Sequence, residues 1–288
     1  MGLLLGVSCL IALGNAQLAS AQDVSIHVPS GAVAGTAASI ATTGSGSADF
    51  YLVGPSIAEK RKVQLGQEIS LPASDLQAAG RYLAIVCADS CSSVGFFVAP
   101  ARPSSLAFLV HPSRAPVAQG ESISGVALPF DEFHNMVFAP AAVDFQLTMQ
   151  GSSPASQKVQ TKDGVAWFRT RPGKSAGPLQ VQASLNDVTT RRMVQQVASD
   201  PCRLRIKGER TAKGIEVETD PVRDCSGNPV PDGTVITFTA KSGDVVDTVD
   251  APVKQDVARA RITANGPVVI SAASGVVMGN ELRLGGHE

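Results

Sequence analysis

Short runs of alternating apolar and polar residues recur along the chain beyond Ala21, where helical periodicity is hard to find. Alternation of this kind is the pattern of a β-strand that buries one of its two faces. Turn-forming Gly, Pro, Asn, Asp and Ser separate the runs at intervals of about 8–15 residues, as in β-sandwiches and barrels. The sequence therefore predicts an all-β protein. Its clearest strand candidates are residues 105–110, 122–128, 143–148, 165–168, 179–183, 204–206, 235–239 and 268–272.

An internal repeat relates the second and third parts of the chain. Several residues match others at a constant offset of 93 positions, and later matches lie at offsets of 92 and 89, so one short deletion in each gap accounts for the drift. Two copies of one module of about 90 residues follow. The matched pairs are Asp131 and Asp224, Asn135 and Asn228, Val137 and Val230, Val143 and Ile236, Phe145 and Phe238, Ala166 and Ala258, and Pro178 and Pro267.

Residues 22–101 lack this repeat but carry another signature. Asp75 is followed by Tyr82, which starts an alternating run that ends at Cys87. In immunoglobulin-like sandwiches a Tyr at the start of such a strand donates a hydrogen bond back to the backbone, forming a tyrosine corner. We therefore expect a third, divergent sandwich here. The expected modules span residues 22–101, 102–199 and 200–288, joined by short proline-bearing linkers that are fairly stiff.

The third part resembles a known bacterial module. Residues 224–238 read Asp-Cys-Ser-Gly-Asn-Pro-Val-Pro-Asp-Gly-Thr-Val-Ile-Thr-Phe, and Gly243 and residues 257–262 continue the pattern. This segment is similar to the bacterial immunoglobulin-like group 1 module of invasin and intimin adhesins. Residues 103–198 match more loosely, with His134 in place of a Gly. The resemblance implies stalk or display modules and not a catalytic unit. With the divergent first sandwich, we expect three tandem immunoglobulin-like β-sandwich modules.

The first 21 residues have the pattern of a secretory signal peptide. They contain no charged side chain, and an apolar run from Leu3 to Leu13 precedes the small residues Ala19 and Ala21. The run is about half as long as the roughly 20 apolar residues of a transmembrane helix. We therefore expect cleavage after Ala21 and a secreted, periplasmic or surface-displayed protein with no integral membrane segment after cleavage.

Signal cleavage removes Cys9 and leaves four of the five cysteines. An even number in an oxidising compartment indicates disulfide bonds. Sequence proximity favours the pairs Cys87–Cys91 and Cys202–Cys225 among the three possible pairings. A zinc site is the alternative, although zinc sites usually have short C-x-x-C knuckles and an intracellular setting.

Charge and motif content argue against several functional classes. The formal net charge is −1, and no part of the chain carries the basic field that nucleic-acid binding needs. The sequence contains no G-x-S-x-G motif, phosphate-binding loop or dinucleotide fingerprint, and its four histidines are scattered. We expect no catalytic residue, no cofactor and no nucleic-acid partner.

The loop that precedes the strand around Phe145 offers a candidate metal site. Asp131, Glu132 and Asn135 could supply three oxygen ligands to calcium, which binds about six to eight. Turn chemistry is the alternative, because Asp and Asn side chains bond to the local backbone and tolerate left-handed conformations.

The same loop is unusually apolar in the second module. Its apolar residues either pack at a junction between modules or contact a partner protein. They are Phe130, Phe133, Met136 and Phe138, which align with Arg223, Ser226, Pro229 and Pro231. Further on, one residue of the adjacent pair Trp167 and Phe168 must face inward, and size favours Trp167 as the core residue.

Together these features predict a non-catalytic structural or protein-binding component of the cell envelope. Its expected partner is a protein at the envelope or surface. The alternatives are an adhesin that binds a host or neighbouring cell and a periplasmic accessory protein of a secretion or surface-assembly system.

Overall fold

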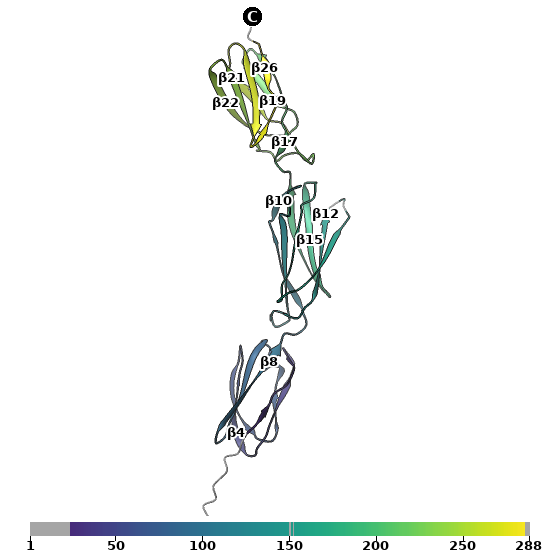
Figure 1. Cartoon of the computed structure of the whole chain (residues 1–288), viewed down its shortest axis with the longest axis vertical. Helices are drawn as coiled ribbons and strands as arrows, with labels where there is room; N and C mark the ends of the chain where they lie inside the picture. The colour runs from purple at the N-terminus through teal and green to yellow at the C-terminus, as the bar shows by residue number, and fades with distance from the viewer. Residues whose placement is uncertain (1–23, 150, 152, 286–288) are drawn as a thin grey trace, which may run out of the picture. The chain divides into compact units, whose positions relative to one another are not determined.

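The computed structural model describes residues 24–149, 151 and 153–285 (Figure 1). Strands and turns dominate these residues, and the helical element among them is a short 3-10 helix, η1 (Ala73–Leu76). No helix in the described part of the chain is long and apolar enough to cross a membrane. The expected signal peptide, residues 1–21, lies outside the described residues. Inter-residue contacts divide the chain into two compact units, with the boundary between Ala101 and Arg102.

The first unit is a sandwich of a three-stranded and a five-stranded sheet. Its initial segment contributes to both sheets, because β1 pairs with β3 in one and β2 pairs in parallel with β8 in the other. The three-stranded sheet consists of β1 (Ile26–His27), β3 (Ala38–Thr42) and β6 (Glu68–Leu71). The five-stranded sheet consists of β2 (Ala32–Val33), β8 (Cys91–Ala99), β7 (Gly80–Cys87), β4 (Ser47–Val53) and β5 (Ala58–Gln64).

Tyr82 forms the predicted tyrosine corner of this sandwich. Its side chain is fully buried and stacks on Phe96, with ring centroids 5.4 Å apart. Its hydroxyl lies 2.9 Å from the carbonyl oxygen of Ala78 and 3.2 Å from that of Asp75, both in the segment around η1. These two carbonyl oxygens lie in a turn and not in a strand, so the tyrosine hydroxyl supplies a hydrogen-bond donor to them.

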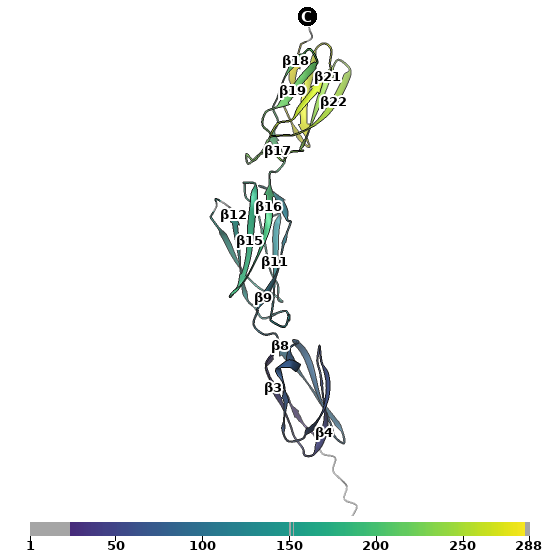
Figure 2. The same ribbon diagram turned by 180° about the vertical axis from the view of Figure 1, so that it is seen from behind.

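The second unit begins with another pair of sheets of the same plan. Again the first segment switches sheets, because β9 pairs with β11 and β10 pairs in parallel with β16. The three-stranded sheet consists of β14 (Ala166–Thr170), β11 (Ile123–Phe130) and β9 (Ser105–His111), the last two of which are neighbours in Figure 2. The five-stranded sheet consists of β10 (Arg114–Pro116), β16 (Val188–Val197), β15 (Gly177–Leu185), β12 (Ala142–Met149) and β13 (Ala155–Gln160).

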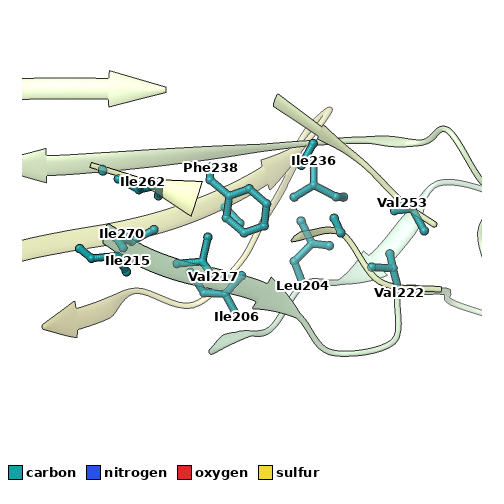
Figure 3. Close-up of a cluster of buried hydrophobic side chains, with 14 of the residues drawn as sticks. Leu204, Ile206, Ile215, Val217, Val222, Ile236, Phe238, Val253, Ile262 and Ile270 are labelled. Atoms are coloured by element: carbon teal, nitrogen blue, oxygen red, sulfur yellow. The ribbon is translucent and has the colours of Figure 1, made fainter. Parts of the chain in front are cut away.

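The rest of the second unit forms a third sandwich. Phe238 is fully buried at its centre, among Ile236, Ile215, Ile262 and Ile270 from both sheets (Figure 3). One sheet consists of β18 (Ile206–Thr211), β19 (Gly214–Thr219) and β23 (Arg259–Ile262). The other consists of β22 (Val245–Pro252), β21 (Val235–Ser242), β24 (Val268–Ser274), β25 (Val277–Met278) and β26 (Leu282–Leu284), and β17 (Pro201–Arg203) pairs with β20 (Arg223–Asp224).

The sequence repeat corresponds to a repeated backbone arrangement. The N–H of Asp131 donates to the carbonyl of Asn135 over 3.0 Å, and the N–H of Asp224 donates to that of Asn228 over the same distance.

The sheets described above make the chain all-β, with three tandem sandwiches, as predicted. It contains the disulfide bonds Cys87–Cys91 and Cys202–Cys225.

Candidate functional site

The loop after β11 is organised by the carboxylate of Asp131, which is 1% exposed. Its Oδ1 accepts hydrogen bonds from the N–H groups of Phe133 and Asn135, at 3.0 and 2.8 Å, and its Oδ2 accepts one from Nδ2 of Asn135 at 2.9 Å. Glu132, the other expected calcium ligand, is exposed. The observed contacts are those of turn chemistry, and the calcium site stays a prediction.

The equivalent loop of the third sandwich repeats this geometry. Oδ1 of Asp224 accepts from the N–H groups of Ser226 and Asn228, at 2.8 and 2.9 Å, and Oδ2 accepts from that of Ser199 at 3.1 Å. Burial raises the pKa of the Asp224 carboxyl, but the hydrogen bonds from Asn228, Ser199 and Ser226 outweigh this and hold the pKa below its usual value of 3.8.

This lowered pKa makes the third sandwich sensitive to acid. A carboxylate whose pKa is depressed by folding contributes stability above its unfolded pKa, and this contribution is lost as the pH falls through the folded pKa. We therefore expect Asp224→Asn to lower the free energy of unfolding at neutral pH and to cost less at about pH 3. Urea unfolding at both values checks this, and an equal cost at both would contradict it.

His134 occupies a backbone position that favours glycine. Its φ angle is 64°, and Gly227, at the equivalent place in the third sandwich, has φ of 88°. We expect His134→Gly to raise the free energy of unfolding by about 0.5 kcal/mol, because a side chain is strained at this φ, and Gly227→Ala to lower it by about 1 kcal/mol. Urea unfolding of the two variants measures both free energies of unfolding. If both variants gain stability, or both lose it, the explanation by backbone strain is wrong.

The orientation of the adjacent aromatic residues on β14 differs from the prediction. Trp167 was expected in the core, but it is 60% exposed, whereas Phe168 is 1% exposed. The Phe168 ring lies 4.6 Å from that of Phe145 and covers Gly125 of β11, where any Cβ would overlap it. The space that Gly125 leaves admits Phe168, and strand alternation then directs Trp167 outward.

Trp167 belongs to an apolar row on the outer face of the β14–β11–β9 sheet. We call Leu109, Val126 and Trp167 the apolar row, because Val126 on the central strand lies opposite Leu109 on one side and Trp167 on the other. Leu109 is 67% exposed, so two large apolar side chains of the row face solvent. The three residues come from three strands, and only the strand register brings them together.

The corresponding row of the third sandwich is charged. Trp167 matches Arg259 at the repeat offset of 92, and Arg259 lies opposite Glu218, which lies opposite Lys207. The Glu218 carboxylate is 3.0 Å from Nζ of Lys207 and 2.9 Å from Nε of Arg259. Hydrogen bonds from Lys207 and then Arg259 lower the pKa of Glu218. The same sheet position therefore tolerates ion pairs, and the fold does not require an apolar row.

Three of the four apolar loop residues extend this face. Phe130 lies opposite Met136 in a β-bridge, and the N–H of Val137 donates to the carbonyl of Pro129 over 2.9 Å. This pairing continues the sheet past β14, so Phe130, Met136 and Phe138 lie on the side of Val126. Phe138 is 58% exposed, and Phe133 lies half-buried in the loop itself.

Sequence comparison finds no matching family model and no matching curated protein. Several solved structures are nevertheless similar in fold. FdeC, an Escherichia coli adhesin, matches with a TM-score of 0.65 and 16% identity over 92% of this chain and 97% of its own. Invasin, a bacterial integrin-binding protein, matches with a TM-score of 0.55 and 13% identity over 92% of this chain and 60% of its own.

InvD of Yersinia pseudotuberculosis gives a TM-score of 0.52 with 11% identity, over 92% of this chain and 98% of its own. At such identities the likeness concerns the fold. This chain has the tandem immunoglobulin-like fold of invasin-type bacterial adhesins.

Proposed function

We propose that this chain is an exported, non-catalytic, protein-binding component of the cell envelope, of the adhesin type. The observation that carries the proposal is the apolar row Leu109, Val126 and Trp167, which exposes two large apolar side chains where the third sandwich has ion pairs. Exposed apolar patches on otherwise polar surfaces mark interaction sites, and Trp and Arg are frequent among residues that dominate binding. The loop residues Phe130, Met136 and Phe138 enlarge this site.

Location outside the cytoplasm is part of the proposal. The disulfide bonds Cys87–Cys91 and Cys202–Cys225 support it, because such bonds persist in oxidising compartments. Likeness of fold to FdeC and invasin favours display at the surface. We also propose a signal peptide of residues 1–21 and modules that span 22–101, 102–199 and 200–288. The first boundary is supported by the division of contacts at Ala101.

Fractionation of the native cells, with protease shaving and mass spectrometry, tests location and processing together. We expect a protease-accessible protein whose mature chain starts at Gln22. Cross-linking in the same cells tests binding, and Trp167→Arg should reduce the cross-links of the wild-type chain. A cytoplasmic protein with an intact N-terminus would contradict the proposal. A soluble periplasmic one would favour the accessory role in secretion or surface assembly.

A further inference from the structure

We propose that the side chain of Asn228 fixes the third sandwich to the second, so that these two sandwiches move as one rigid body. The inference goes beyond the proposed function and does not rest on it, because it concerns a joint within the chain and not a partner. Both sandwiches belong to the same compact unit, which begins at Arg102, and hydrogen bonds within that unit carry the inference.

The amide of Asn228 makes two hydrogen bonds to the backbone of the second sandwich. Its Oδ1 accepts from the N–H of Ala176 over 2.9 Å, and its Nδ2 donates to the carbonyl of Lys174 over 2.7 Å. Lys174 and Ala176 lie in the loop that connects β14 to β15, and both of these strands belong to the second sandwich. One side chain therefore serves as donor and acceptor to the same loop, as the backbone of a neighbouring strand would.

The carboxylate of Asp224 holds this amide in the orientation that both bonds require. Nδ2 of Asn228 also donates to Oδ1 and Oδ2 of Asp224, at 3.2 and 3.0 Å. An ionised carboxylate only accepts hydrogen bonds, so the amide nitrogen must face it, and the amide oxygen is left to face the N–H of Ala176. Asp224 is 4% exposed, so water competes little for its oxygens.

Asn228 is held in place on its own side of the joint. The disulfide bond of the third sandwich links the loop that contains Asn228 to β17, and β17 pairs with β20 just before this loop. Residues 198–200 are the whole connection between β16 of the second sandwich and β17 of the third. One of them, Ser199, donates its N–H to Oδ2 of Asp224 over 3.1 Å. The connection and the loop therefore form one fixed base for Asn228.

The loop that receives Asn228 is fixed to the body of the second sandwich. The N–H of Gly173 donates to Oε1 of Gln196, a residue that is 1% exposed. The carbonyl of Gly173 accepts from the N–H of Ala118 over 3.0 Å. Gln196 lies on β16, the strand that leads into the connection between the two sandwiches. Each side of the joint is thus anchored by its own sandwich, and the amide of Asn228 links the two anchors.

Two hydrogen bonds are enough to fix the joint because the connection is short. A tether of residues 198–200 keeps the two partners close, so the bonds form at a high effective concentration. One intramolecular hydrogen bond shifts an equilibrium about 2- to 12-fold, so the two together favour the docked joint about 5- to 150-fold. Removing the Asn228 amide should therefore release the third sandwich from the second without unfolding either.

Pulsed electron paramagnetic resonance on the mature chain, residues 22–288, tests the proposal. Non-natural amino acids that carry a nitroxide replace Met193 on β16 and Val235 on β21, which are 56% and 50% exposed. This labelling leaves the cysteines in their disulfide bonds and places one label on each sandwich. We expect one narrow distribution of distances between the labels. A broad distribution in the otherwise wild-type chain would overturn the proposal.

Asn228→Ala removes both bonds across the joint and preserves the loop. Asp224 still accepts hydrogen bonds from the backbone N–H groups of Ser226 and of position 228, and the disulfide bond remains. We expect a broad component to appear in the distance distribution, with the ratio of narrow to broad component falling about fivefold or more. A distribution as narrow as that of the wild type would show that Asn228 does not fix the joint.

Asn280→Ala is the matched control, because Asn280 makes the same two kinds of bond inside the third sandwich. Its Oδ1 accepts from the N–H of Ile206 over 2.7 Å, and its Nδ2 donates to the carbonyl of Ile206 over 3.2 Å. We expect Asn280→Ala to lower the urea midpoint of the third sandwich and to leave the distance distribution narrow. If it broadens the distribution as much as Asn228→Ala does, general loosening of the third sandwich explains both results, and the role assigned to Asn228 is wrong.

Discussion

Replacing Cys202 and Cys225 by serine will lower the free energy of unfolding of the third sandwich by about 3 kcal/mol. The disulfide links β17 to the loop after β20 and spans 23 residues. Without it, the unfolded chain gains the conformational entropy that the cross-link removes, and this gain grows with the length of the closed loop. Urea unfolding of the mature chain under non-reducing conditions measures the loss.

The chain offers two matched controls for this prediction. Glu132 takes the place of Cys225 in the second sandwich, so the transition of that sandwich should not move. The pair Cys87–Cys91 is separated by only 4 positions, and its replacement by serine should cost less, about 2 kcal/mol. A larger cost for the short loop would contradict the entropic explanation.

Phe168→Ala will destabilise the second sandwich by about 3–5 kcal/mol, whereas Trp167→Ala will change its stability by less than about 0.5 kcal/mol. Phe168 is 1% exposed and packs on Phe145, so its truncation leaves a cavity between the two sheets. Trp167 is larger, but its ring lies mostly in solvent, and its loss exposes little apolar surface.

Urea unfolding of both variants, followed by circular dichroism, compares these adjacent residues in one strand. The Phe168→Ala variant retains Trp167, whose fluorescence follows the same transition independently. Because Phe168 and Trp167 face opposite sides of the sheet, equal costs would mean that the assigned orientation of β14 is wrong.

Much of the fold was accessible from residue patterns. The matches of Asp131 and Asn135 with Asp224 and Asn228 reflect one loop built twice, because in each copy the Asp carboxylate accepts hydrogen bonds from the N–H groups of the loop. Tyr82 also has the predicted hydrogen bonds to the upstream backbone. In each of these features the bonded residues are close in sequence, so the sequence alone was enough to predict them.

The apolar row was not accessible in the same way. Leu109, Val126 and Trp167 are distant in sequence, and their proximity depends on the register of three strands. The orientation of Trp167 was ambiguous as well, since alternation in a short strand allows either of two adjacent aromatic residues to face inward. Gly125 resolves the ambiguity, but only once β11 is known to lie beside β14.

The parallel pairings of β2 with β8 and of β10 with β16 have a mechanical consequence. In each of these two sandwiches the second strand lies parallel to the last strand and beside it, so tension applied through the chain pulls the two along each other. The hydrogen bonds between them are then loaded together, in shear, and must break at once for the sandwich to extend. Antiparallel neighbours pulled apart from one end would instead break one bond at a time. Resistance to stretching is therefore built into the way the initial segment of these two sandwiches crosses between the sheets.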